Sequence, residues 1–177
     1  MVLPSIRAAK LNEKRLKLRQ QYWPDVPEEM LWHRKKSDGF ITIPRVLPLV
    51  MAILDDTAKN KPLSKTYFGL WCRTFDENMV TIQSPQVMAF EAGFRSQRAA
   101  QTWKARMQTL VDLGFIMAKP GGAGDFSAVL ILNPIFVIRK LRESKRAKIQ
   151  DAKFNALVAR ASEVGAKDFD FPLPKKK

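Results

Sequence analysis

A basic and amide-rich segment in the middle of the chain has the side chains that contact bases and phosphates in DNA. Arginine can bridge the two acceptors on the edge of guanine, and glutamine can pair with the edge of adenine. No acidic residue occurs between Arg95 and Gln108, which suits a helix lying between two phosphate backbones. The candidate contact residues here are Arg95, Ser96, Gln97, Arg98, Gln101, Thr102 and Lys104. The alternative is a helix that exposes these side chains only to water.

Two helices joined by a tight turn are predicted to position these residues. Ser84 and Pro85 suit the cap and first turn of a short helix to Ala92, which Gly93 ends. Ser96 is expected to cap a longer helix that reaches Leu113. A stripe of residues at helical spacing should be its buried face: Ala99, Ala100, Trp103, Met107, Leu110 and Val111. Gly114 then suits a left-handed C-terminal cap.

A β-hairpin is expected to follow this helix. Strand-forming residues occupy 115–119 and 126–132, and the segment 120–125 between them is rich in glycine. We expect Lys119 and Gly122 to lie where the hairpin could contact phosphates or the minor groove. A plain hairpin turn explains the same glycines.

The preceding segment is predicted to supply the rest of a core. We expect a strand at Phe40–Ile43, helices from Pro44 to Asp56 and from Ser64 to Asp76, and a short strand at Met79–Gln83. Asn133-Pro134 should open another helix after the hairpin.

The order of these elements resembles the winged helix-turn-helix superfamily of DNA-binding proteins. The similarity covers about half of the chain and is carried by Ser84–Phe94, Ser96–Trp103 and the joint Asp112–Ile116. An alanine in the short helix and a glycine at the turn match the pattern, because closely crossing helices need small residues there. The resemblance implies a mainly α fold with a small β-hairpin, namely a winged helix-turn-helix with N- and C-terminal helical extensions.

The excess of positive charge lies mostly at the two ends. Lys and Arg outnumber Asp and Glu by 9 to 4 in residues 1–36, by 10 to 8 in 37–138 and by 12 to 5 in 139–177, out of a net charge of +14. We therefore expect a basic N-terminal helix or arm with a linker (1–38), a winged domain (39–141) and a basic C-terminal helix and tail (142–177). The basic ends should add affinity for a polyanion without reading sequence.

A second apolar stripe occurs near the C-terminus, at Phe154, Leu157, Val158 and Ala161. It could pair with its equivalent in another copy, since two-fold DNA sites favour dimers, or it could dock on its own chain. A homodimer is the expected assembly.

Residues for catalysis or metal binding do not form a recognisable pattern. Cys72 is the single cysteine, which excludes an internal disulfide and a cysteine cluster, and His33 has no obvious partner. The pairs Asp55-Asp56 and Asp76-Glu77 fall at predicted helix ends, where carboxylates act as caps. The glycine-rich segment lacks a nucleotide-binding fingerprint. We expect no enzyme activity, no cofactor, no metal and no small-molecule substrate.

The function expected from these patterns is sequence-specific binding of double-stranded DNA, as a transcriptional regulator or repressor. The arrangement is also similar to small DNA-binding proteins of bacterial plasmids and integrative elements. No apolar run reaches the roughly 20 residues of a membrane span, so a cytoplasmic protein associated with nucleoid or plasmid DNA is expected. Three alternatives remain open: a replication initiator or partition-site binder, an RNA-binding protein using its basic arms, and a module that contacts an acidic protein.

Overall fold

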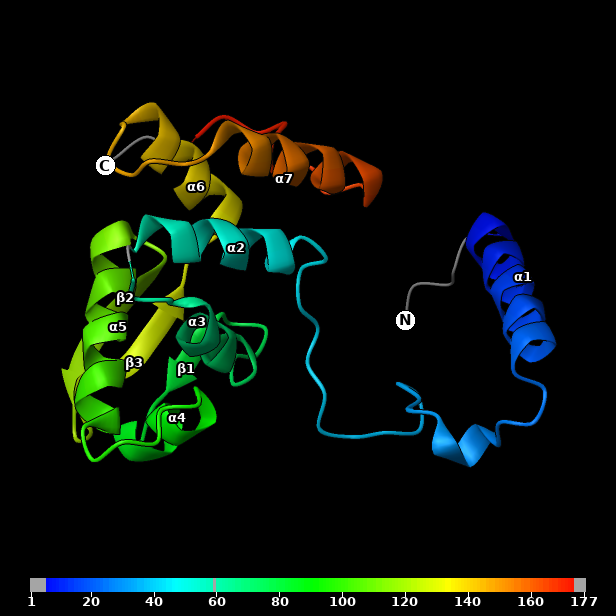
Figure 1. Cartoon of the computed structure of the whole chain (residues 1–177), viewed down its shortest axis with the longest axis horizontal. Coiled ribbons are helices and arrows are strands. Elements are labelled where there is room, and N and C mark those ends of the chain that lie inside the picture. The colour runs from blue at the N-terminus through cyan, green and yellow to red at the C-terminus, as the bar shows by residue number, and fades with distance from the viewer. Residues whose placement is uncertain (1–5, 59, 174–177) are drawn as a thin grey trace. The chain divides into compact units, whose positions relative to one another are not determined.

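The chain divides into two compact units, the first ending at Phe40 and the second beginning at Ile41 (Figure 1). The computed structural model describes residues 6–58 and 60–173. In the first unit, α1 (Ile6–Tyr22) is followed by one turn of 3-10 helix at Glu28–Met30. Pro27 precedes the single turn and makes no side-chain cap.

The second unit contains the remaining elements of the described residues. They are α2 (Leu47–Thr57), α3 (Ser64–Trp71), β1 (Met79–Thr81), α4 (Pro85–Glu91), α5 (Ala99–Leu113), β2 (Ile116–Gly121), β3 (Gly124–Ile131), α6 (Pro134–Glu143) and α7 (Asp151–Glu163). This is a set of helices with one small antiparallel sheet. Its element order is compatible with a winged-helix layout.

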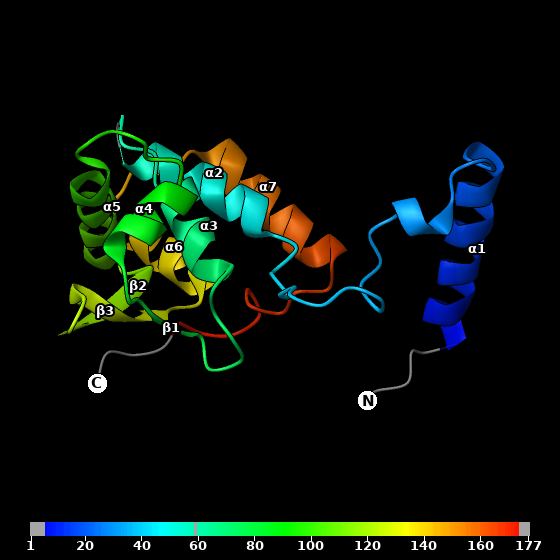
Figure 2. The same cartoon turned by 90° about the horizontal axis from the view of Figure 1, so that it is seen from below.

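The sheet has the strand order β1-β3-β2, with both pairs antiparallel. The short strand before α4 therefore joins the hairpin that follows α5, because Val80 lies opposite Val129. Helices gather on one side of this sheet (Figure 2). Val80 and Val129 are buried towards the helices, whereas Met79, Met117 and Leu130 are exposed on the other face.

Aromatic side chains connect the helices to the sheet in the core. Trp103 of α5 meets Phe126 of β3 edge to face, with ring centroids 6.0 Å apart. Tyr67 of α3 meets Phe115 in the same way at 5.6 Å. Trp103, Tyr67 and Phe115 are fully buried. The predicted inward face of the long helix is confirmed for Trp103, Met107 and Leu110, while Ala99, Ala100 and Val111 are half-buried.

Several predicted boundaries are wrong. Phe40–Ile43 pairs with no strand of the described residues and is irregular chain. The first core helix begins at Leu47 rather than Pro44, because Pro44 lies in a turn whose carbonyl accepts from the Leu47 N–H at 2.9 Å. The second ends at Trp71, five residues before Asp76.

The C-terminal helices pack on the rest of the second unit. Asn133 caps α6 as expected, since its side chain accepts from the Ile135 N–H at 3.0 Å. The boundary expected after residue 141 falls inside α6. Helix α7 lies against α2, burying Leu157 and Ala161. Docking on the same chain is thus confirmed for Leu157 and Ala161, whereas Val158 stays 37% exposed. The homodimer stays a prediction.

Candidate nucleic-acid interface

A tight turn connects α4 to α5 and fixes the angle between them. Gly93 has φ +84°, a left-handed conformation that favours glycine, and the Phe94 N–H donates to the Ala89 carbonyl at 2.9 Å. Ala89 and Ala92 are buried where the two helices meet. The small residues that suggested a helix-turn-helix therefore lie at this contact.

Helix α5 begins two residues later than expected. Ser96 does not cap it. Arg98 holds the cap position without a side-chain hydrogen bond, and the Ser96 carbonyl accepts from the Ala99 N–H at 2.9 Å. Residues 96–98 thus form a turn ahead of the helix. The predicted Ser96 cap is therefore wrong, because the Ser96 carbonyl, and not its hydroxyl, accepts the hydrogen bond at the start of the helix.

The predicted contact residues nevertheless share one exposed surface, divided between that turn and the first turns of α5. Thr102 is half-buried and the others are exposed. We call this set the recognition surface: Arg95, Ser96, Gln97, Arg98, Gln101, Thr102 and Lys104. Trp103 points the opposite way, into the core.

The cations of the recognition surface have no ion pair with any described residue. Arg95, Arg98 and Lys104 lack a carboxylate within salt-bridge distance. Arg95 instead stacks on the exposed Phe90 ring of α4, with its guanidinium carbon 5.0 Å from the centroid. Such a stack orients the guanidinium while leaving its N–H groups able to donate.

The carboxylate at the end of α4 is already neutralised. Arg73 Nε donates to Glu91 Oε2 at 2.8 Å, and this hydrogen bond holds the pKa of the Glu91 carboxyl below its ordinary value. Glu91 is therefore paired with Arg73 and not with a cation of the recognition surface. The positive potential of that surface is left without an internal counter-ion.

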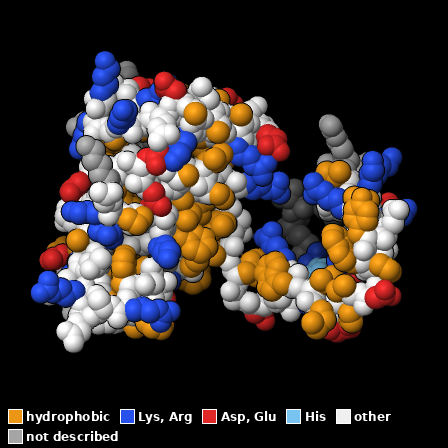
Figure 3. Space-filling view, viewed as in Figure 1, with side chains coloured by type: hydrophobic (Ala, Val, Ile, Leu, Met, Phe, Trp, Pro, Cys, Tyr) orange, Lys and Arg blue, Asp and Glu red, His pale blue; other side chains and the backbone are white. Residues whose placement is uncertain are grey.

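The β2–β3 hairpin, here called the wing, stands beside α5. Lys119 is exposed on β2 and Gly122 is exposed at the tip. A Cβ atom built on Gly124 would lie 3.9 Å from Lys104 Nζ, so the Lys104 ammonium reaches the wing. Basic side chains gather at the lower left of Figure 3, over this part of the unit.

The wing turn is shorter than the glycine-rich segment expected between the strands. The strands extend to Gly121 and Gly124, so the glycine-rich segment 120–125 is mostly strand. Ser127 Oγ accepts from the Ala123 N–H at 3.0 Å and donates to the Gly124 carbonyl at 2.8 Å. The two residues between the strands, Gly122 and Ala123, therefore form a tight turn, and the predicted strand ends at residues 119 and 126 are wrong. Gly122 keeps its predicted place at the tip.

Lys65 of α3 is a basic residue near this surface that the sequence did not reveal. Its Nζ lies 3.8 Å from where a Cβ on Gly93 would stand, beside the turn between α4 and α5. Lys65 is exposed and has no ion pair with a described residue. Its position depends on how α3 packs on α4, which no local pattern encodes.

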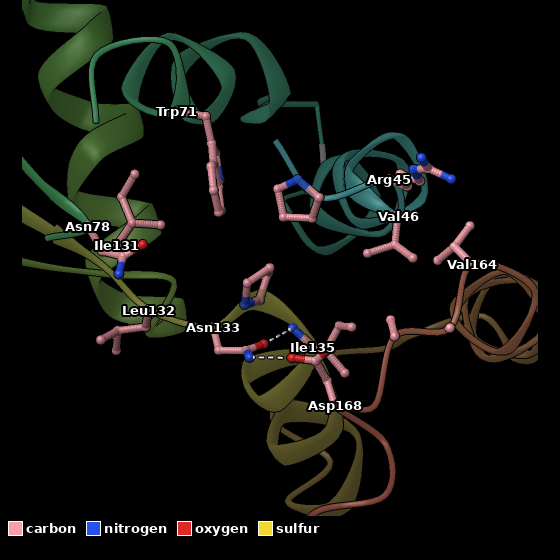
Figure 4. A pocket seen from close by; sticks show the side chains of 14 residues that line it. Arg45, Val46, Trp71, Asn78, Ile131, Leu132, Asn133, Ile135, Val164 and Asp168 are labelled. Atoms are coloured by element: carbon pink, nitrogen blue, oxygen red, sulfur yellow. Dashed lines mark hydrogen bonds between the residues drawn. The ribbon is translucent and has the colours of Figure 1, made fainter. Parts of the chain in front are cut away.

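A cavity of about 430 Å³ lies elsewhere in the second unit, where α2, α6 and the segment after α7 meet (Figure 4). Two of its polar side chains are bonded to each other, since Asn133 Nδ2 donates to Asp168 Oδ1 at 2.6 Å. The Trp71 ring and Val46 supply apolar walls.

The carboxylates considered for acid–base chemistry have structural partners or lie exposed. Asp55 accepts from the N–H groups of Leu63 and Ser64, at 2.6 and 2.8 Å, and so caps the start of α3. Asp56 pairs with Lys153 of α7 at 2.6 Å. No group of three or more metal-binding side chains occurs in the part of the chain that the structure describes.

Comparisons with known proteins gave no relative. No protein-family model, curated protein or solved structure matches the chain. None of the helices among residues 6–58 and 60–173 has the length and apolar composition needed to cross a membrane.

Proposed function

We propose that the chain binds double-stranded DNA in a sequence-specific manner through a winged helix-turn-helix and acts as a transcriptional regulator. In this assignment α4 and α5 are the helix-turn-helix, α5 is the recognition helix, and β2–β3 is the wing. The strand order β1-β3-β2, with β1 before α4 and the hairpin after α5, supports this assignment.

The observation that carries the proposal is the recognition surface. Exposed arginine and glutamine side chains stand at the start of a helix whose opposite face is buried, and the cations have no internal ion pair among the described residues. The N-terminal part of a recognition helix is where base edges are contacted. Arg98 and Gln101 have the donors for guanine and adenine.

The phosphates on either side of the groove would be contacted by cations on α5 and on the elements beside it. Lys104 and Lys119 stand at the wing, and Lys65 stands at the turn between α4 and α5. Each phosphate neutralised releases counter-ions and makes binding depend on salt. These lysines would fix the orientation of the domain without distinguishing sequences.

The test is selection of a duplex from a random pool, followed by anisotropy titration of the enriched site. Arg98→Ala and Gln101→Ala should each weaken that complex by about 5- to 150-fold, because a bidentate base contact is worth ~1–3 kcal/mol. Binding to a scrambled duplex should change far less, at most several-fold for the lost cation.

The matched control removes the same side-chain types elsewhere in the second unit. Arg45→Ala and Gln150→Ala alter exposed residues outside the recognition surface that have no ion pair with a described residue. They should leave the specific complex within about twofold, since they contact no base. Equal losses in both sets, or no enriched sequence at all, would show that α5 does not read DNA.

A further inference from the structure

The first unit has its own basic and aromatic surface, separate from α5. Among residues 10–40 no side chain is buried, so this unit has no apolar core. Exposed hydrophobic side chains and cations lie on the same face of this unit, as the right-hand part of Figure 3 shows. Four aromatic residues are exposed there: Tyr22 at 62%, Trp23 at 61%, Trp32 at 67% and Phe40 at 44%.

These rings are paired with each other and with a guanidinium. Trp32 meets Phe40 edge to face at 6.1 Å, and the Arg34 guanidinium carbon lies 5.2 Å from the Phe40 centroid. Tyr22 meets Trp23 in the same geometry at 5.7 Å. Each cluster contains a tryptophan that is more than 60% exposed, and stacking a planar ligand requires such exposed ring surface.

Six cations of this unit have no ion pair with any described residue. Lys17 forms an ion pair with Glu13, and Arg19 forms one with Glu28. The exposed cations without an ion pair are Lys10, Lys14, Arg15, Arg34, Lys35 and Lys36. Lys10, Lys14 and Lys17 recur at helical spacing, so one side of α1 presents a row of ammonium groups.

We propose that the first unit is a second nucleic-acid site, which binds unpaired strands. Bases stack on the exposed rings of Trp23 and Trp32, while the cations without internal partners contact the phosphates. Stacking requires an open base face, which a single strand offers and a duplex does not. This activity is additional to duplex recognition by α5 and does not depend on it.

The distribution of apolar residues on α1 favours a nucleic acid over a protein partner. A helix that docks on a protein or a membrane concentrates its apolar residues in a stripe. Leu11 and Leu18 lie on one side of α1, but Leu16 lies on another, with Arg15 and Lys17 beside it. Single strands are bound without sequence preference by this combination of charge and stacking.

The experiment uses the full chain, with 20-nucleotide oligothymidylate and oligouridylate as probes and a random 20-base-pair duplex for comparison. Binding is followed by anisotropy and by tryptophan fluorescence. Trp71 and Trp103 are 8% and 0% exposed, so quenching by a stacked base reports on Trp23 and Trp32. We expect quenching by both single strands. If only oligothymidylate quenches the fluorescence, the bound strand is DNA. If only oligouridylate does so, it is RNA.

Removing both exposed indoles tests the stacking. Trp23→Ala with Trp32→Ala should weaken single-strand binding at least about 30-fold, because each of the two rings stacks a base at ~1–3 kcal/mol per base. The matched Trp23→Phe with Trp32→Phe variant should restore affinity to within about threefold, since phenylalanine also stacks. Duplex binding should stay within about twofold in both variants. Equal losses from alanine and phenylalanine would overturn the stacking.

Removing charge tests the phosphate contacts. Lys10→Ala, Lys14→Ala and Arg15→Ala together should make the plot of log affinity against log salt shallower by about 2, at about 0.7 per phosphate of a single strand. An unchanged slope would overturn this role of α1.

Three further outcomes would assign the surface differently and overturn the proposal. Loss of single-strand binding in the Arg98→Ala and Gln101→Ala variant would place the strand on α5. Binding to phosphatidylserine vesicles but not to oligonucleotides would identify a membrane surface. Dissociation of a dimer by the paired Trp→Ala changes, without an effect on oligonucleotide binding, would identify a contact between copies. Because duplex selection is measured separately, failure of either site is distinguishable from failure of the other.

Discussion

The two units of the chain differ in what their aromatic residues do. In the second unit, Trp103, Tyr67 and Phe115 are fully buried between helices and sheet. In the first unit, Trp23 and Trp32 are more than 60% exposed, and no residue from 10 to 40 is buried. The same residue type therefore stabilises the fold in one unit and is open to a ligand in the other.

The two functions that we propose would place sequence reading in the second unit and general attraction to polyanions in the first. Residues 37–138, which include the recognition surface, carry a net charge of only +2, out of +14 for the chain. In this proposal α5 depends on the local arrangement of its cations rather than on net charge. We therefore expect changes in the first unit to alter affinity and salt dependence, and changes in the second to alter stability or specificity.

The largest effect should come from exchanging one tryptophan in each unit. Trp103→Ala removes a fully buried ring that contacts Phe126, and should lower the free energy of unfolding by about 3–5 kcal/mol. Trp32→Ala removes an exposed ring, and should change it by less than about 0.5 kcal/mol. Urea unfolding followed by circular dichroism measures both. A comparable loss for Trp32→Ala would mean that the first unit stabilises the second.

Alkaline pH should distinguish the units through their tyrosines, Tyr22 and Tyr67. Burial raises the pKa of the Tyr67 hydroxyl above its ordinary value of about 10. Above pH 10 the unfolded chain therefore loses this proton first, and stability should fall by up to about 1.4 kcal/mol per pH unit. Below pH 10 the hydroxyl is protonated in both the folded and the unfolded chain, so the stability that Tyr67 contributes is fully present.

Tyr67→Phe should abolish that part of the decline, measured by urea unfolding between pH 9 and 11. Tyr22→Phe is the matched control, because Tyr22 is exposed in the first unit, and its profile should follow the parent chain. If both variants decline like the parent, deprotonation of other groups causes the alkaline loss.

Local signals in the sequence located most helix ends. Ser84-Pro85 and Asn133-Pro134 open α4 and α6, because a capping side chain and a proline act within one turn. Gly93 and Gly114 have the positive φ angles expected of helix ends. The exposed surface of α5 was also predictable, since the buried stripe leaves the other positions to solvent.

Features that depend on packing between distant elements were not predictable. The Ser96 hydroxyl was expected to cap α5, but the turn from Gly93 makes Arg98 the cap residue. Pairing of β1 with β3, and the position of Lys65 beside Gly93, join segments about 30 to 50 residues apart. The two possible partners of Leu157 could not be separated, because an apolar stripe does not specify which surface covers it.

A pair of glycine substitutions tests whether backbone strain is transmitted equally in the two units. Gly39 and Gly114 have φ angles of +70° and +83°, and a Cβ atom at either position would meet nothing within 4 Å. Alanine should therefore cost only the conformational strain of about 1–2 kcal/mol in the left-handed region. At Gly114 this strain falls between α5 and the buried Phe115, whose N–H donates to the Leu110 carbonyl at 2.9 Å.

Gly114→Ala should consequently lower the free energy of unfolding of the second unit by about 1–2 kcal/mol. Gly39→Ala should leave it unchanged within about 0.5 kcal/mol, since the strain can be relieved locally where no core is present. Urea unfolding of the full chain measures both variants against the parent. An equal cost at the two glycines would show that the units unfold together, and the first unit would then be part of the cooperative fold rather than an independent binding element.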